Sequence, residues 1–265
     1  MTYKEIKKEK HIFIYGVNGR SSSTALQRII NSSGEICIWG EAWGIDQPFL
    51  DFIEQIEIKK KDFDERLPKE HYDFLKESFI TGKHDTFYPN AFNDLSLSIE
   101  HIKNAFVEMI KPVNDVKRFG YKEIRVQNPT NLSTLIRLFP NCKIIFLFRD
   151  PRKQWISVRD SGWFGFSNNI EMFNSEYTRI SRVYQEVYEK HGENCLFIEN
   201  NILYNEKRVK NLIDILDLKS FDESLINNII STKSKNVLSN EEELIINNSS
   251  LNSYLDLQNL VDNRI

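Results

Sequence analysis

Apolar and polar positions divide the chain into short apolar runs and longer amphipathic stretches. Five apolar runs have the length and composition of buried β-strands, at 11–15, 35–39, 119–124, 142–148 and 194–199. The run at 142–148 is the most apolar, and we expect it to be the central strand of a sheet. Strands that alternate with helical segments predict an α/β fold, with a parallel sheet of about five strands flanked by helices.

The best-supported helix spans 171–190, because its large apolar side chains recur every three or four positions. They share one helical face: Phe173, Tyr177, Ile180, Tyr184 and Val187. Weaker patterns predict a helix that ends near residue 31 and others at 131–138, 205–217, 222–231 and from 241 onward.

Residues 46–118 interrupt the alternation with a long stretch that is helical in pattern and rich in aromatic residues. An insertion after a strand of an open α/β sheet commonly covers the ligand crevice at the carboxyl ends of the strands. We therefore expect a single domain over residues 1–265, with 46–118 as a helical cap.

The composition is that of a soluble globular protein, with 40% hydrophobic and 28% charged residues in 265. The net charge of −3 argues against broad nucleic-acid binding, and the sequence contains no apolar run long enough to span a membrane. Cys37, Cys142 and Cys195 lie in or beside apolar runs and are expected to be reduced and buried. They form no metal-binding cluster, so we expect no metal site. Because the sequence shows neither an apolar signal region nor a membrane-spanning run, we expect a cytoplasmic protein.

The stretch FIYGVNGRSSSTALQRI, at 13–29, predicts a strand, a tight turn and a helix. Such a unit directs backbone N–H groups and the positive end of a helix dipole at one point, which suits an anion. Gly16 and Gly19 permit the tight turn, Arg20 offers a planar cation, and hydroxyls follow at Ser21, Ser22, Ser23 and Thr24. The alternative interpretation is an ordinary turn before a serine-rich helix cap.

A second candidate site follows the strongest strand, in FLFRDPRKQWIS. Arg149 ends the strand, Asp150-Pro151 begins a helix, and Ser157 lies a little more than two turns into it. Arg149 then faces the same crevice as the first loop, and Ser157 is placed to share a second anion with it. Alternatively, Asp150 only caps the helix and Arg149 makes a structural ion pair.

Together, GVNGRSSST and FLFRDPR…S resemble the two cofactor-binding motifs of the sulfotransferase family. The resemblance implies a P-loop-like sulfotransferase fold and 3′-phosphoadenosine-5′-phosphosulfate (PAPS) as the donor, with no metal required. It also implies that Arg149 and Ser157 hold the 3′-phosphate of PAPS. The 5′-phosphosulfate would be held by Gly19, Arg20, Ser21, Ser22, Ser23 and Thr24. The usual loop is closer to G-x-P-R-S-G-T-T, so this chain departs from it at Asn18-Gly19 and at Ser22, which replaces a glycine.

The resemblance extends to the second and third predicted strands. WGE, at 39–41, is similar to the Gly-Glu of tyrosylprotein-type sulfotransferases and implies Glu41 as general base. FGYKEI resembles the strand that brings a lysine to the cofactor, which implies a catalytic role for Lys122 beside Arg20. Without the resemblance, Glu41 is a surface residue of a turn and Lys122 pairs with Glu123. His84 and His101 are alternative bases.

The resemblance also implies that 46–118 shapes the site of a small-molecule acceptor carrying a hydroxyl or amine. Trp43, Trp163, Phe164 and Phe166 flank the motifs and either line an apolar pocket or belong to the core. The sequence identifies neither the acceptor nor the oligomeric state.

Two other functions stay open from the residues alone. A P-loop kinase or nucleotide hydrolase would use Asp150 for magnesium, but the lysine of a Walker loop is missing from 16–23. A degenerate, non-catalytic sulfotransferase-like module would account for Asn18-Gly19 and for the missing glycine at Ser22.

Overall fold

A parallel five-stranded sheet forms the centre of the molecule. The computed structural model describes residues 3–41, 44, 46–66, 95–112, 116–125, 128–162, 165–227 and 236–262. The strands lie in the order β2-β3-β1-β4-β5, and each neighbouring pair is parallel. They are β1 (Ile12–Gly16), β2 (Ile36–Glu41), β3 (Arg118–Glu123), β4 (Lys143–Phe148) and β5 (Cys195–Glu199). The predicted α/β fold and all five predicted strands are confirmed.

The sequence predicts that the run at 142–148 is the central strand, but the central strand of the sheet is β1. That run forms β4, which lies between β1 and β5 and is buried over 144–148. Both strands are continuous apolar runs, because an interior strand of such a sheet is covered by helices on both faces. Hydrophobicity therefore identifies interior strands but does not rank them.

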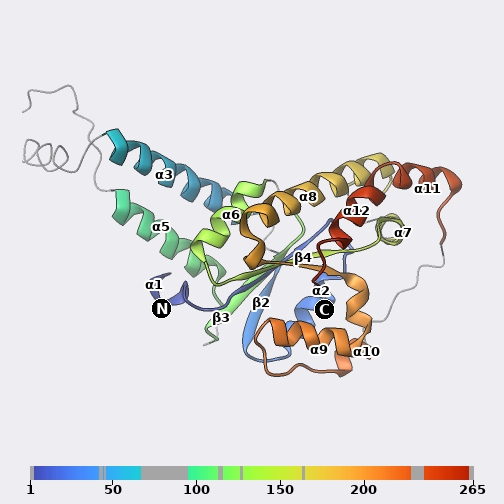
Figure 1. Ribbon diagram of the computed structural model, residues 1–265, viewed down its shortest axis with the longest axis horizontal. Helices are drawn as coiled ribbons and strands as arrows, with labels where there is room; N and C mark the ends of the chain where they lie inside the picture. The colour runs from blue at the N-terminus through green and yellow to red at the C-terminus, as the bar shows by residue number, and fades with distance from the viewer. Residues whose placement is uncertain are drawn as a thin grey trace, which may run out of the picture.

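Helices cover both faces of the sheet (Figure 1). Because side chains alternate along a strand, Phe13 and Tyr15 of β1 enter one hydrophobic cluster, and Ile12 and Ile14 enter the other. The first cluster is completed by α1 (Tyr3–Ile6), α3 (Asp46–Arg66), α5 (Leu95–Ile110), α6 (Pro129–Leu138), α7 (Pro151–Ser161), α8 (Ile170–His191), α11 (Asn240–Asn247) and α12 (Ser250–Gln258). The second is completed by α2 (Ser23–Asn31), η2 (Asn200–Tyr204), α9 (Glu206–Ile215) and α10 (Ser224–Asn227).

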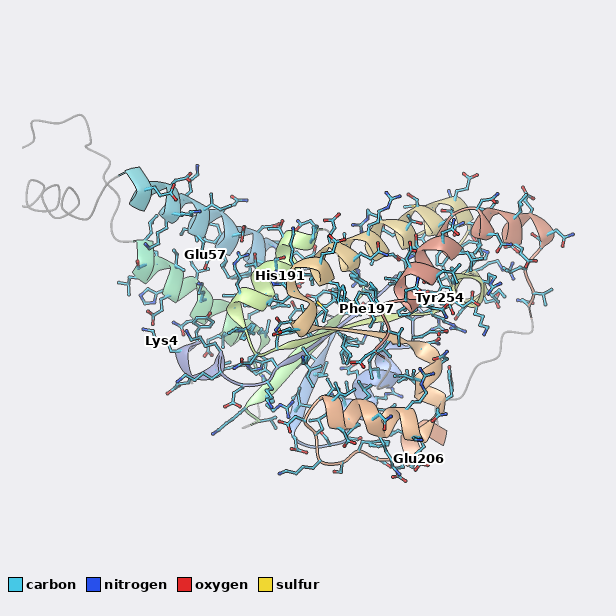
Figure 2. The ribbon with its side chains drawn as sticks, viewed as in Figure 1. Lys4, Glu57, His191, Phe197, Glu206 and Tyr254 are labelled. Atoms are coloured by element: carbon cyan, nitrogen blue, oxygen red, sulfur yellow. The ribbon has the colours of Figure 1, made fainter. Side chains whose placement is uncertain are left out.

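The predicted apolar face of 171–190 is confirmed in α8, where all five of its large side chains are buried. Tyr184 stacks on Phe146 of β4 with the ring centroids 4.2 Å apart. Tyr254 of α12 lies on the same side of the sheet, and its ring packs edge-on against Phe148. Tyr254 and Phe197 of β5, both labelled in Figure 2, belong to the same hydrophobic cluster, and α12 packs against β5 and α8.

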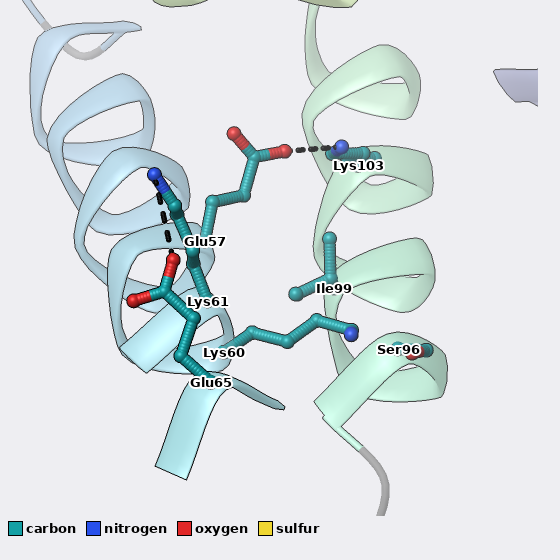
Figure 3. Close-up of a pocket in the computed structure, with 7 residues that line it drawn as sticks. All are labelled: Glu57, Lys60, Lys61, Glu65, Ser96, Ile99 and Lys103. Atoms are coloured by element: carbon teal, nitrogen blue, oxygen red, sulfur yellow. Dashed lines mark hydrogen bonds and ion pairs between the residues drawn. The ribbon is translucent and has the colours of Figure 1, made fainter. Parts of the chain in front are cut away.

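The predicted insertion contains two described helices, α3 (Asp46–Arg66) and α5, which pack side by side. They extend away from the sheet (Figure 1), and α3 also packs on α6. A pocket of about 500 Å³ lies between α3 and α5 (Figure 3). It is lined by Glu57, Lys60, Lys61, Glu65, Ser96, Ile99 and Lys103. Residues 67–94 lie outside the described residues. The cap and its role toward an acceptor therefore stay predictions.

The cysteine prediction is confirmed for Cys142 and Cys195, which are buried free thiols, whereas Cys37 is half-buried. Burial raises the pKa of all three thiols, that of Cys195 to about 12. Within the described part of the chain, none of the helices has the length and apolar character needed to cross a membrane.

Gly120 of β3 is required by the close approach of β1. A Cβ added at Gly120 would lie 1.6 Å from the carbonyl oxygen of Ile12, which is backbone and cannot rotate away. We predict that Gly120→Ala lowers the free energy of unfolding by roughly 3 kcal/mol or more, measured by urea denaturation. Gly165→Ala is the matched control, because nothing lies within 4 Å of its added Cβ. Equal stability of the two variants would contradict this packing.

Candidate active site

The predicted site residues meet at the carboxyl edge of the sheet. The chain leaves β1 toward β2 on one side, and it leaves β4 toward β5 on the other. This divergence makes the edge between β1 and β4 the topological switch point, where open α/β sheets bind ligands. The loop 17–22 follows β1 and Arg149 follows β4, so both predicted anion-binding motifs lie at this point.

The loop 17–22 has an alternating backbone. Asn18, Arg20 and Ser22 have φ angles of 55°, 67° and 76°, a left-handed conformation that non-glycine residues rarely adopt. Left-handed residues that recur in a tight turn help to direct backbone N–H groups toward one point, as they do in anion-binding nests. Gly16 permits the tight turn, as expected, because a side chain there would collide with the loop. A Cβ added at Gly16 would lie 2.4 Å from Ser21 Oγ. The left-handed positions, however, are not glycines.

Neighbouring elements hold the loop in this conformation. Gln154 of α7 is fully buried, and its Nε2 donates to the carbonyl oxygens of Val17 at 2.6 Å and Gly19 at 2.7 Å. Asn200 Nδ2, after β5, donates to Ser22 Oγ at 3.3 Å. The sequence analysis missed Gln154, whose only signal is its position one turn before Ser157 on the same helix.

The two motifs are in direct contact. Arg20 Nε donates to Ser157 Oγ at 3.0 Å, and Arg149 Nη1 donates to the carbonyl oxygen of Arg20 at 3.3 Å. These residues are more than a hundred positions apart in the sequence. The contact brings Arg20, Arg149 and Ser157 together, but Ser157 bonds to Arg20, which the resemblance assigns to the 5′-phosphosulfate, rather than to Arg149. Asp150 caps α7 through the N–H of Arg152 and pairs with its guanidinium, as its structural interpretation expects.

Two polar groups at or beside this contact, Arg149 Nε and Ser21 Oγ, are buried without a hydrogen-bond partner in the described residues. Burial lowers the pKa of the Arg149 guanidinium, and the charge of Arg20 lowers it further, against the opposite effects of Tyr204 and Asp150. Unsatisfied buried donors are costly in a folded protein and call for a partner. The unsatisfied Nε of Arg149 and the hydroxyl of Ser21, with the cation Arg20 beside them, form a site suited to an anion.

The third group of predicted residues lies at the carboxyl ends of β2 and β3. Glu41 Oε1 accepts from Lys122 Nζ at 3.1 Å, and Glu41 Oε2 accepts from Arg125 Nη1 at 2.9 Å. Burial raises the pKa of the Glu41 carboxyl, but hydrogen bonds and charge from Lys122 and Arg125 outweigh it and lower the pKa. Lys122 stands opposite Ile14 of β1, two residues before Gly16, so this group adjoins the loop.

A β-bulge directs Glu41 toward Lys122. Trp39 pairs with Tyr121 and Glu41 with Lys122, so Gly40 is the extra residue of β2. In a regular pairing without the bulge, Glu41 would stand opposite Glu123. Its side chain would then point to the other face of the sheet, because side chains alternate along a strand. Bulges commonly redirect side chains in this way beside active sites.

The alternative pairing of Lys122 with Glu123 is wrong. Glu123 is fully buried on the opposite face, where it accepts from the backbone N–H groups of Gly44, Ile124 and Arg125.

Of the alternative bases, His101 is exposed on α5, and His84 lies outside the described residues. Trp43, Trp163 and Phe164 also lie outside them, whereas Phe166 is half-buried against Phe173 of the core. Within the described residues, no group of His, Cys, Asp and Glu side chains is arranged to hold a metal ion.

Comparisons with known proteins identify the family of the chain and agree with its fold. A family model described as "Sulfotransferase family" matches residues 11–222, which include all five strands and every predicted site residue. The structure of a sulfotransferase from Alicyclobacillus acidocaldarius is similar, with a TM-score of 0.52, 13% identity and 96% of each chain covered. So is the sulfotransferase domain of the Synechococcus PCC 7002 olefin synthase, with a TM-score of 0.51 and 17% identity over 89% of this chain and 83% of that one. At these identities the similarity establishes the fold. A comparison with curated proteins gives no match.

The left-handed backbone at Ser22 yields a stability prediction. We expect Ser22→Gly to raise the free energy of unfolding by about 0.5–1 kcal/mol, because glycine adopts this φ without steric cost. Ser22→Ala keeps the unfavourable conformation and loses only the bond from Asn200, so it should be neutral or destabilising. Urea denaturation of both variants measures the difference. If both changes destabilised the protein equally, the loss of the Ser22 hydroxyl, rather than the backbone conformation, would account for the change in stability.

Proposed function

Because the chain belongs to the sulfotransferase family, we propose that it transfers a sulfuryl group from PAPS to a hydroxyl or amine of a small-molecule acceptor. The contact between the two anion-binding motifs carries this proposal. Arg20 bonds to Ser157, and Arg149 Nε and Ser21 Oγ are buried without partners among the described residues. A donor with phosphate groups at both ends of its nucleoside requires such a double site.

The charges of the site fit that donor. Arg20, Ser21, Ser22, Ser23 and Thr24, with Gly19 and the first N–H groups of α2, would hold the 5′-phosphosulfate. Ser22, the N-cap of α2, makes no side-chain capping bond. Arg149 and Ser157 would hold the 3′-phosphate, and a guanidinium is suited to phosphate oxygens because its donors are planar and permanently charged.

The residues of the site match the demands of the reaction. Sulfuryl transfer forms a bond from sulfur to the acceptor atom and breaks the bond from sulfur to the bridging oxygen of PAPS, so negative charge grows on the leaving phosphate. Fixed cations and N–H groups lower such a barrier, and Arg20, the loop amides and Lys122 would supply them. No metal is required in this scheme.

Glu41 would act as the general base. The acceptor's hydroxyl or amine loses a proton as its oxygen or nitrogen bonds to sulfur, and a carboxylate oxygen of Glu41 would take that proton. The lowered pKa of Glu41 keeps the carboxyl ionised at neutral pH, which is the form that a base needs. Each of its oxygens already accepts one hydrogen bond from a cation, and a carboxylate oxygen has a second lone pair for the acceptor.

The alternative functions have less support. A P-loop kinase or hydrolase would need Asp150 for magnesium, but this carboxylate already caps α7 and pairs with Arg152. A non-catalytic module would have no need of the bulge that directs Glu41 toward Lys122.

Donor binding tests the proposal most simply. We predict that adenosine 3′,5′-bisphosphate, the donor without its sulfuryl group, stabilises the protein in the absence of metal ions. At a hundredfold excess over its Kd, the gain is about 2.7 kcal/mol, measurable as a higher Tm. ATP with magnesium and ligand-free protein are the comparisons. Stabilisation by ATP with magnesium and none by the bisphosphate would identify a nucleotide hydrolase or kinase instead.

A further inference from the structure

Both oxygens of the Glu41 carboxylate are held by cations, and only one of these cations belongs to the predicted site. Lys122 holds Oε1, and Arg125 holds Oε2 at the shorter distance of 2.9 Å. Arg125 lies two residues beyond β3, at the same edge of the sheet as the other site residues. Its side chain is 43% exposed, so it borders the solvent side of Glu41.

A second carboxylate fixes the position of Arg125. Arg125 Nη1 is 3.2 Å from Glu123 Oε1, and the Glu123 side chain is fully buried. Three backbone N–H groups also donate to this carboxylate, from Gly44, Ile124 and Arg125. A buried charge without a cation is strongly destabilising, so Glu123 holds Arg125 at this point whatever Glu41 does.

The backbone around Arg125 is fixed as well. Gln47 at the start of α3 donates to the carbonyl oxygen of Arg125, and Gly44 donates to Glu123 from the turn that follows β2. These bonds connect the end of β3 to the chain just beyond Glu41. The guanidinium therefore reaches Glu41 from a rigid support, which is what a positioning residue requires.

We propose that Arg125 is a positioning residue of the active site, which holds Glu41 in orientation and in its charged form and is itself anchored by the buried Glu123. The catalytic meaning of this role rests on the proposed function, in which Glu41 is the base. Lys122 is then able to turn toward the leaving phosphate while Arg125 keeps Glu41 ionised.

The electrostatics of the site agree with the proposal. Burial raises the pKa of Glu41, and the cations Lys122 and Arg125 lower it by more, through hydrogen bonds and charge. Among the described residues, the charged groups that face Glu41 are these two cations, and Glu123 acts on it through Arg125. Removal of one cation must therefore move the pKa of Glu41 upward.

The test is a pH titration of the Glu41 carboxyl by NMR, in full-length protein with isotope-labelled glutamate and with Glu41→Gln to assign the signal. We expect Arg125→Gln to raise the pKa of Glu41 by about 1. Arg137→Gln is the matched control, because Arg137 pairs with carboxylates on α3 and should leave Glu41 unchanged. An unchanged pKa of Glu41 in folded Arg125→Gln would overturn the proposal.

A second pair of variants keeps the test decisive if Arg125→Gln leaves Glu123 uncompensated and unfolds. Glu123→Gln removes the buried charge, so Glu123→Gln with Arg125→Gln should fold. The double variant should show a higher pKa of Glu41 than Glu123→Gln alone, and equal values would overturn the proposal.

Turnover separates this inference from the proposed function. With radiolabelled donor and a pool of hydroxyl- and amine-bearing small molecules, Glu41→Gln should lose about a hundredfold or more in rate. The acidic limb of the rate profile should move to higher pH in Arg125→Gln. Unchanged turnover in Glu41→Gln would overturn the role of Glu41 as base, and with it the catalytic role of Arg125, even where the titration had confirmed their contact.

Discussion

The loop after β1 is held in a backbone conformation that its own residues disfavour, and the candidate site depends on this constraint. Asn18, Arg20 and Ser22 are all left-handed, a conformation that asparagine tolerates but that costs residues such as Arg20 and Ser22 on the order of 1 kcal/mol each. Gln154 offsets part of that cost with two hydrogen bonds to the loop from α7. Because α7 also carries Ser157, the element that stabilises the loop delivers the second half of the site.

The charged side chains at the same edge of the sheet form two groups, one in which cations lack anionic partners and one in which cations and carboxylates are paired. Around Arg20 and Arg149, cations and N–H groups lack anionic partners of their own in the described structure, which favours a phosphate-bearing ligand. Around Glu41, cations and carboxylates are paired, and the carboxylate stays ionised. The overall charge of −3 conceals this local arrangement. An anion-binding half beside an ionised carboxylate is what transfer of a sulfuryl group to a hydroxyl requires.

The fold, and the location of the predicted site residues at one edge of the sheet, could be predicted from the sequence because they depend on local pattern. Apolar runs of strand length locate β1 and β4, and the motifs that follow them must meet at the carboxyl edge of a parallel sheet. What the sequence leaves open depends on distant contacts. The bulge at Gly40 exists only in the pairing of β2 with β3, and the ion pairs of Arg125 with Glu41 and with the buried Glu123 form only where these two strands end. The left-handed φ of Ser22 likewise reflects its neighbours.

The central claim is that two motifs more than a hundred residues apart form one donor site, and Arg149 is the residue that tests it most directly. Calorimetry would compare adenosine 3′,5′-bisphosphate with adenosine 5′-phosphosulfate, which lacks the 3′-phosphate, on wild-type protein, Arg149→Ala and the control Arg152→Ala. Arg152 lies on the same helix and pairs with Asp150. The account predicts that Arg149→Ala weakens the bisphosphate by about 10- to 100-fold and the phosphosulfate far less. Equal losses for both ligands would contradict it.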